Sequence, residues 1–290
     1  GGTAGAISGG QFVVDIMKEM GYDAIGLGNH EFDFGTPHLT KLVEENGLPV
    51  VNMNLRSLHP DSLFFTPYII KDFGGKKIAF VGVVTPESLI SEAYSFFDKQ
   101  GKQMLSLCED NLVDEVQKTV NEARKAGAHY VILLSHLGEA SAKNFLTSHR
   151  LVASTRGIDV VLDGHTHSRI PCETVLNADG DTVLLSQTGS RFKNVGKLVI
   201  RPDGRMSTEL IPVDSIKQES AHIRQVTDSI EAMMAKVTTN KICHSDYRMD
   251  LFDENGRQMV RTRETCIGNL VADAFRAVTG AQLAVNNGGG

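Results

Sequence analysis

Side chains that could bind a metal ion or a phosphate follow three apolar stretches of the sequence. Asn29 and His30 follow the run 24–27, His136 follows the run 130–134, and His165 and His167 follow the run 160–162. Because open α/β sheets bind ligands at the carboxyl ends of their strands, three strands that end in this way predict one shared site. Polar groups at the ends of buried strands are costly unless they bind something. We interpret this set as a metal and phosphate site.

The predicted ligands offer one amide oxygen and three imidazoles, from Asn29, His136, His165 and His167. Mixed nitrogen and oxygen ligation suits manganese, zinc, iron or cobalt better than calcium or magnesium. Gly164 allows a sharp turn, so that the two histidines after it can reach different ions of a pair. Two-metal hydrolases hold their ions about 3.5–4 Å apart.

His30 is adjacent to the predicted ligand Asn29 but is better placed to face a substrate. Asp33, three residues further on, could orient the His30 ring and stabilise its charged form. The remaining histidines have no such context and are expected on the surface or in the core: His38, His59, His129, His149, His222 and His244.

The predicted ligand set lacks negative charge. Two divalent ions bring four positive charges, which four neutral ligands cannot balance, so carboxylates must come from elsewhere. Glu31 and Asp163 are near in sequence, but neither has an obvious spacing to bridge two ions.

Composition sets further limits. The 290 residues are 41% hydrophobic and 22% charged, with a net charge of -6, which gives no basic surface for a nucleic acid polymer. No apolar run approaches the length of about 20 residues that spans a bilayer. The four cysteines form no CxxC pair, and we expect mostly free, buried thiols.

Hydrophobic periodicity predicts an α/β fold. Helices are expected at 9–20, 36–45, 111–126 and 141–155, with strands at 24–27, 49–53, 130–134 and 160–162 and a hairpin of 67–73 with 77–84. Helix followed by strand, twice in succession, is typical of a mostly parallel sheet. Strands at 182–185, 195–201 and 205–213 are expected to form a second, antiparallel sheet.

The domain boundaries follow from the same pattern. Residues 1–213 are predicted to form the first α/β domain, and 214–238 a connecting helix. Residues 239–290 contain one clear helix, too little for a core of their own, and are predicted to begin a second domain.

At this point the motifs resemble a known family. Gly28-Asn29-His30-Glu31, then His136, then Gly164-His165-Thr166-His167 resemble the calcineurin-like metallophosphoesterases. The longer string 28–35 resembles their bacterial 5'-nucleotidase and UDP-sugar hydrolase branch, and 263–265, 268–274 and 287–290 resemble the start of that branch's C-terminal nucleotide-binding domain. The resemblance implies a four-layer α/β/β/α sandwich with mixed sheets, followed by the start of a C-terminal α/β domain.

The resemblance also implies roles. Asn29, His136 and His165 would bind one divalent ion and His167 the other, with His30 and Asp33 as the catalytic dyad. Asn287, Gly288 and Gly289 are candidate substrate-binding residues. Two further family motifs, which carry the bridging carboxylate, are expected before residue 1, and the nucleotide-binding side chains after residue 290. We therefore expect the chain alone to bind metal weakly and turn over poorly.

The implied activity is release of phosphate from nucleoside 5'-monophosphates, with a metal-bound hydroxide as the nucleophile. The alternatives are a UDP-sugar hydrolase, a 2',3'-cyclic-nucleotide phosphodiesterase or, from another class, a non-catalytic binding module that keeps the fold. Retention of His30 and Asp33 argues against the last. The implied partner is a small nucleotide, and the implied location is extracytoplasmic: periplasmic, secreted or at the cell surface.

Overall fold

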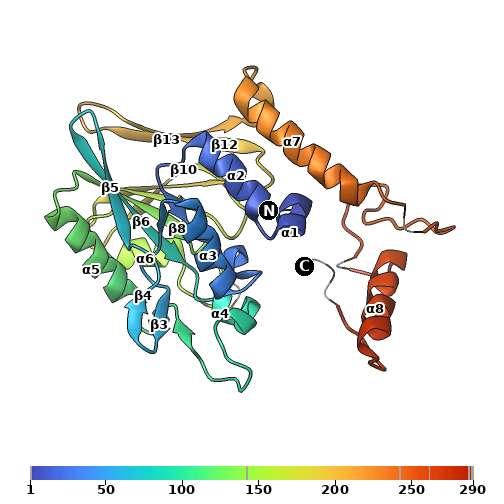
Figure 1. Cartoon of the computed structure of the whole chain (residues 1–290). Coiled ribbons are helices and arrows are strands. Elements are labelled where there is room, and N and C mark those ends of the chain that lie inside the picture. Colours follow the sequence, from blue (N-terminus) through green and yellow to red (C-terminus); the bar gives the residue numbers. More distant parts are fainter. Residues whose placement is uncertain (1, 142, 242, 261, 287, 289–290) are drawn as a thin grey trace. The chain divides into compact units, whose positions relative to one another are not determined.

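The computed structural model describes residues 2–141, 143–241, 243–260, 262–286 and 288 (Figure 1). The chain divides into two compact units, one up to residue 234 and one from residue 235. The α-helices are α1 Gly2–Ser8, α2 Gln11–Met20, α3 Thr36–Asn46, α4 Ser88–Ser91, α5 Leu112–Lys125, α6 Ser148–Ser154, α7 Ala221–Thr238 and α8 Cys266–Thr279. Short 3-10 helices are η1 Asn29–Phe32, η2 Ala93–Ser95 and η3 Val213–Ser215.

The strands of the first unit form one large sheet and three small ones. The large sheet has the order β10-β11-β9-β8-β6-β5, with β5 Tyr68–Phe73, β6 Lys76–Val84, β8 Tyr130–His136, β9 Val160–Asp163, β10 Arg169–Leu176 and β11 Thr182–Thr188. The small sheets are β1 Ile25–Gly26 with β2 Val50–Val51, β4 Asp61–Leu63 with β3 Arg56–Leu58 and β7 Leu105–Ser106, and β12 Asn194–Ile200 with β13 Met206–Pro212.

The large sheet directs the carboxyl ends of its parallel strands to one edge. Strands β6, β8, β9 and β11 run parallel to one another, whereas the outer strands β5 and β10 are antiparallel to their neighbours. In this register β8 ends at His136 and β9 ends at Asp163, just before the Gly164 turn. The carboxyl ends of β8 and β9 therefore bring His136 and the loop of His165 and His167 together, as expected from the sequence, whereas β1, the strand before Asn29, belongs to the small sheet with β2.

Two hydrophobic cores hold the layers. On one face of the large sheet, α5 and α6 pack their apolar stripes, including Val116, Val120 and Leu151, against Val131 and Val161. On the other side, a second core joins α3 to η1 and β2, and Figure 1 shows α5 and α3 on opposite sides of β6 and β8. The order helix, sheet, sheet, helix is the layered arrangement expected.

The large sheet and the small sheet of β1 and β2 approach closely at Gly82. A Cβ placed on Gly82 of β6 would lie 1.9 Å from the carbonyl oxygen of Val51 in β2. The Met53 N–H donates to the Gly82 carbonyl over 2.9 Å. Only glycine permits this contact between the backbones of the two layers.

Several local expectations are confirmed. Helix α2 ends at Gly21, which adopts the left-handed conformation with φ of 67°, and α3 carries a proline in its first turn. The hairpin β5–β6 turns through two glycines with positive φ. Strands β12 and β13 are antiparallel as predicted.

Other expectations are wrong. Strand β11 does not belong to a second antiparallel sheet but pairs in parallel with β9, because its buried Val183 and Leu185 complete the core of the large sheet. The helix expected at 141–155 is limited to α6, which begins after Thr147, whose hydroxyl caps it by accepting from the Arg150 N–H. Residue 142 lies outside the described residues.

The cysteines are unpaired, but the expectation that they are buried is wrong for most of them. Only Cys108 is buried, whereas Cys172, Cys243 and Cys266 are exposed. Burial raises the pKa of the Cys108 thiol to about 11.

The second unit contains α8, whose first turn is capped by the Thr265 hydroxyl, which accepts from the Gly268 N–H over 3.1 Å. Phe252 and Gln258 form an isolated antiparallel bridge around a turn in which the Gly256 N–H donates to the Asp253 carbonyl. The boundaries predicted for the domains, 1–213, 214–238 and 239–290, stay a prediction. Among the described helices, none is both long and apolar enough to cross a membrane.

Candidate metal centre and phosphate site

Asn29 and His136, 107 residues apart in sequence, meet at the centre of the candidate site. The His136 ring Nε2 lies 3.2 Å from the Asn29 side-chain oxygen Oδ1. Asn29 begins η1 after β1, and His136 is the last residue of β8. Together with Asp163 and Gly164, His136 lines a cavity of about 330 Å3 at the ends of β1, β8 and β9.

The donor atoms of this pair fit a divalent metal. Two ligands about 2.1 Å from one ion, at angles of roughly 90–110°, lie about 3.0–3.4 Å apart, which matches the separation of Oδ1 and Nε2. Burial, and then the charges of His165, His30 and His167, lower the pKa of His136 to about 4. The His136 ring is therefore neutral near pH 7, as ligation by an imidazole requires.

Two glycines make room for the His136 ring. A Cβ on Gly28 would lie 2.7 Å from Cε1 of His136, and a Cβ on Gly164 would lie 2.8 Å from Nδ1. Neither glycine has a positive φ, so close approach rather than backbone conformation accounts for both. The ring is thus enclosed on two sides by backbone.

His165 and His167 lie on the loop after β9, and both adopt positive φ, 78° and 60°. Such a conformation is costly for residues other than glycine and marks a loop held by its surroundings. The His165 ring centroid lies 5.3 Å from that of His136. His167 is exposed, and its ring makes no hydrogen bond or ion pair with the described residues. The structure thus brings the His165 ring beside that of His136, whereas the His167 ring is close enough to influence the His136 pKa but makes no hydrogen bond or ion pair with the described residues.

A network of polar side chains holds the loop after β9 in place. The Glu139 carboxylate accepts hydrogen bonds from the hydroxyls of Thr166 and Ser168. Gln187, which is 1% exposed, donates to Glu139 over 3.3 Å and accepts from the Ser168 N–H over 2.6 Å. These bonds restrain the residues on either side of His167.

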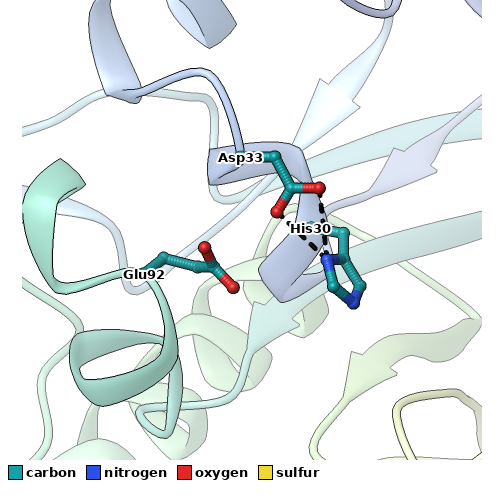
Figure 2. Close-up of side chains that lie close together, drawn as sticks. All are labelled: His30, Asp33 and Glu92. Atoms are coloured by element: carbon teal, nitrogen blue, oxygen red, sulfur yellow. Dashed lines mark hydrogen bonds and ion pairs between the residues drawn. The ribbon is translucent and has the colours of Figure 1, made fainter. Parts of the chain in front are cut away.

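His30 and Asp33 form the expected pair. The ring Nδ1 of His30 lies 3.0 Å and 3.2 Å from the two carboxylate oxygens of Asp33 (Figure 2), and both side chains are exposed. Glu92, between α4 and η2, points toward them; the ligand atoms of these three residues lie within 4.8 Å of one another. Glu92 is 8% exposed, and burial, with the charge of Asp33, raises its pKa.

The acidic residues nearest in sequence are engaged elsewhere. Glu31 accepts from the Gly28 N–H over 2.6 Å. Asp163 accepts from the Gly138 N–H over 3.2 Å, and burial raises its pKa. Neither Glu31 nor Asp163 is therefore free to supply the missing negative charge.

The predicted substrate residues at the C-terminus lie in the second unit. Gly288 lines a cavity of about 710 Å3 together with Arg263, Thr265 and Asn269. Asn287 and Gly289 lie outside the described residues. Their role stays a prediction.

Comparison with known proteins identifies the family. Residues 7–187 match the family model described as bacterial capsule synthesis protein PGA_cap. The chain belongs to this family. The resemblance to calcineurin-like metallophosphoesterases of the 5'-nucleotidase branch is also confirmed, both by the curated relatives of this PGA_cap chain and by solved structures with its fold.

Among those relatives, the trifunctional nucleotide phosphoesterase protein YfkN of Bacillus subtilis is 26% identical over 95% of this chain and 20% of its own length. The 2',3'-cyclic-nucleotide 2'-phosphodiesterase/3'-nucleotidase of Haemophilus influenzae is 32% identical over 54% of this chain and 25% of its own length. The chain thus spans about a quarter or less of these two relatives. The crystal structure of a 5'-nucleotidase precursor from Thermus thermophilus superposes with a TM-score of 0.68, at 23% identity, over 93% of this chain and 55% of that one. This superposition shows that the chain has the metallophosphoesterase fold.

Sequence reasoning missed three acidic residues at this site of the PGA_cap chain: Glu87, Glu92 and Glu139. Glu92 follows no strand directly, and only the fold brings it to the site, whereas Glu139 follows the end of β8 by three residues. Glu87 follows β6, the strand next to β8, so the same rule of strand ends could have found it.

Proposed function

We propose that the chain contains metal-binding and catalytic residues of a divalent-metal-dependent phosphohydrolase that releases phosphate from nucleoside 5'-monophosphates. One observation supports this most strongly. Asn29 and His136 present their donor atoms 3.2 Å apart, beside the paired His30 and Asp33. The names of the relatives, which include several 5'-nucleotidases, agree in chemistry with this arrangement.

In this proposal Asn29, His136 and His165 would hold one divalent ion, and His167 a second. Manganese, zinc, cobalt and iron suit such donors. The ions, when bound, would activate water and neutralise charge on the phosphoryl oxygens. The backbone enclosure of His136 fixes one ligand in advance, which favours metal binding.

His30 would act directly on the substrate. Its Nδ1 is paired with Asp33, which leaves Nε2 free to donate a hydrogen bond or a proton to a phosphoryl or leaving-group oxygen. The carboxylate fixes the orientation of the ring. The exposed ring can be reached by a nucleotide from solvent.

A second candidate is hydrolysis of 2',3'-cyclic nucleotides, which the name of the Haemophilus influenzae relative favours. Hydrolysis of UDP-sugars uses the same metal chemistry and is tested alongside it. An extracytoplasmic location is part of the proposal, since the relatives include snake venom 5'-nucleotidases.

The test is phosphate release from AMP by the longest natural protein that contains this sequence, with Mn2+ or with EDTA. The 290-residue chain is assayed in parallel. His30→Ala should reduce release by about 10²- to 10⁴-fold, the usual contribution of a general acid. The control is His59→Ala, which removes an exposed histidine in the turn between β3 and β4.

The substrates separate the alternatives. Cleavage of 2',3'-cyclic AMP or UDP-glucose without release from AMP would keep the site and change the substrate. Absence of Mn2+-dependent cleavage of all three would contradict the proposed function and favour a non-catalytic binding module.

A further inference from the structure

Glu87 is held rigidly at the same sheet edge as the predicted ligands. It follows β6, the neighbour of β8, and precedes α4. Its N–H donates to the Thr85 hydroxyl over 3.2 Å, and the Ser88 hydroxyl donates to the Thr85 carbonyl over 2.8 Å. Thr85 and Ser88 are 1% and 0% exposed, so this turn is anchored in the core.

From this turn the carboxylate reaches the predicted ligand His165. Oε2 of Glu87 lies 3.2 Å from Nε2 of the His165 ring, and Oε1 lies 3.1 Å from Nζ of Lys143. The side chains of Glu87 and His165 are largely buried, at 22% and 18% exposure, unlike most ion pairs of this chain. Both carboxylate oxygens are therefore engaged, one by a histidine and one by a lysine.

This contact decides which ring nitrogen of His165 carries the proton. A carboxylate accepts hydrogen bonds, so the nitrogen that faces it is the Nε2–H donor, and in the neutral ring Nδ1 then carries the lone pair. Histidines that bind metals generally donate their other N–H to a carboxylate or carbonyl, which fixes the tautomer and the ring orientation. The backbone of His165 also lies in the left-handed region, a conformation that persists only when the surrounding structure holds it.

We propose that Glu87 is a positioning residue that holds His165 as the Nε2–H tautomer and presents Nδ1 toward a divalent metal. Lys143 occupies the other carboxylate oxygen and limits rotation of the Glu87 side chain. The proposal rests on the proposed function for the metal, whereas the tautomer belongs to the protein alone. The two can therefore fail separately.

The first test measures the tautomer without metal. Nitrogen-15 NMR of the imidazoles in EDTA-treated protein should show His165 as the Nε2–H form in the wild type. Glu87→Ala should give a mixture of tautomers, and Glu87→Gln, whose amide oxygen still accepts a hydrogen bond, should restore most of the wild-type form. The control is Glu173→Gln, which alters the similar pair Glu173 and His149, 2.9 Å apart, away from the site.

The second test measures Mn2+ binding by calorimetry with the same variants. We expect Glu87→Ala to weaken the affinity by about 10- to 100-fold, the usual effect of losing such a partner, and Glu87→Gln to lie between it and the wild type. Glu173→Gln should stay within about twofold of the wild type, as expected for a pair away from the metal ligands.

An unchanged tautomer in Glu87→Ala, or an unchanged Mn2+ affinity, would overturn the positioning role. If Glu87→Ala does not fold, Glu87→Gln is the deciding variant, and it should keep the Nε2–H tautomer of His165 and lose part of the Mn2+ affinity. The proposal is contradicted if Glu87→Gln keeps both the tautomer and the full affinity, or if it loses both. If the wild-type protein does not hydrolyse AMP but Glu87→Ala still changes the tautomer of His165, the proposed function alone is refuted.

Discussion

Replacing Gly28 by alanine tests the enclosure of His136 with a single methyl group. The new Cβ would lie 2.7 Å from Cε1 and 2.9 Å from Nε2 of the ring, and 3.0 Å from a carboxylate oxygen of Glu31. Ordinary contact begins at 3.4 Å, so the ring must move by about 0.7 Å at Cε1. Gly28 has an extended backbone, with φ of -107°, which alanine adopts without strain.

The displacement is large for a metal ligand and modest for the fold. Ligand distances in metal sites hold to about 0.2 Å, so a shift of about 0.7 Å should weaken Mn2+ binding by about 10- to 100-fold. The steric cost to folding should be about 1–3 kcal/mol, typical of overpacking. The Mn2+ affinity of Gly28→Ala should therefore fall while most of the protein remains folded.

The assay is Mn2+ titration by calorimetry, with thermal unfolding in EDTA to measure stability. The matched control is Gly5→Ala in α1, where the nearest atom to a new Cβ is 3.9 Å away. We expect this control to bind as the wild type does. Equal affinity of Gly28→Ala and Gly5→Ala would refute the reasoning that the backbone at Gly28 places the His136 ring.

Further predictions concern the packing of the sheets, the titration of His136 and the loop network. Gly82→Ala should destabilise the fold by about 3 kcal/mol, because its Cβ would meet the Val51 carbonyl at 1.9 Å; an unchanged urea midpoint would contradict this close approach. In metal-free protein, the unfolded chain protonates His136 between pH 6.5 and about 4 while the folded chain does not. Stability should therefore fall, by up to about 3 kcal/mol, as the pH drops through that window, and His136→Gln should flatten this slope in urea unfolding. Glu139→Ala removes the acceptor of the Thr166 hydroxyl and should weaken Mn2+ binding, measured by calorimetry, about tenfold. A wild-type affinity in this variant would show that the conformation of the loop does not depend on Glu139.

The site could be predicted where it depended on strand ends. The apolar runs before His136 and after Gly157 are bounded by polar residues and glycines, so β8 and β9 and the residues that follow them were foreseen. The pairing of His30 with Asp33 follows from a spacing of three within one helical turn. These features depend on local patterns that the sequence displays directly.

The remainder depended on contacts between distant segments. Strand β11 reads like a strand of an antiparallel pair, and only its register with β9 places it in the large sheet. The extent of α6 is decided by the Thr147 cap, which periodicity alone does not reveal. Glu87 follows a turn containing a proline, and its distance to His165 exists only after β6, β8 and β9 have assembled.

The most direct test of the account is the position of a bound metal. Crystals of the protein grown with Mn2+ should show an anomalous difference peak bonded to Asn29, His136 and His165, with His30 beside it and not coordinated. A peak held instead by His30, Asp33 and Glu92, whose ligand atoms also lie close together, would contradict the assignment of the ligands and of the His30 role.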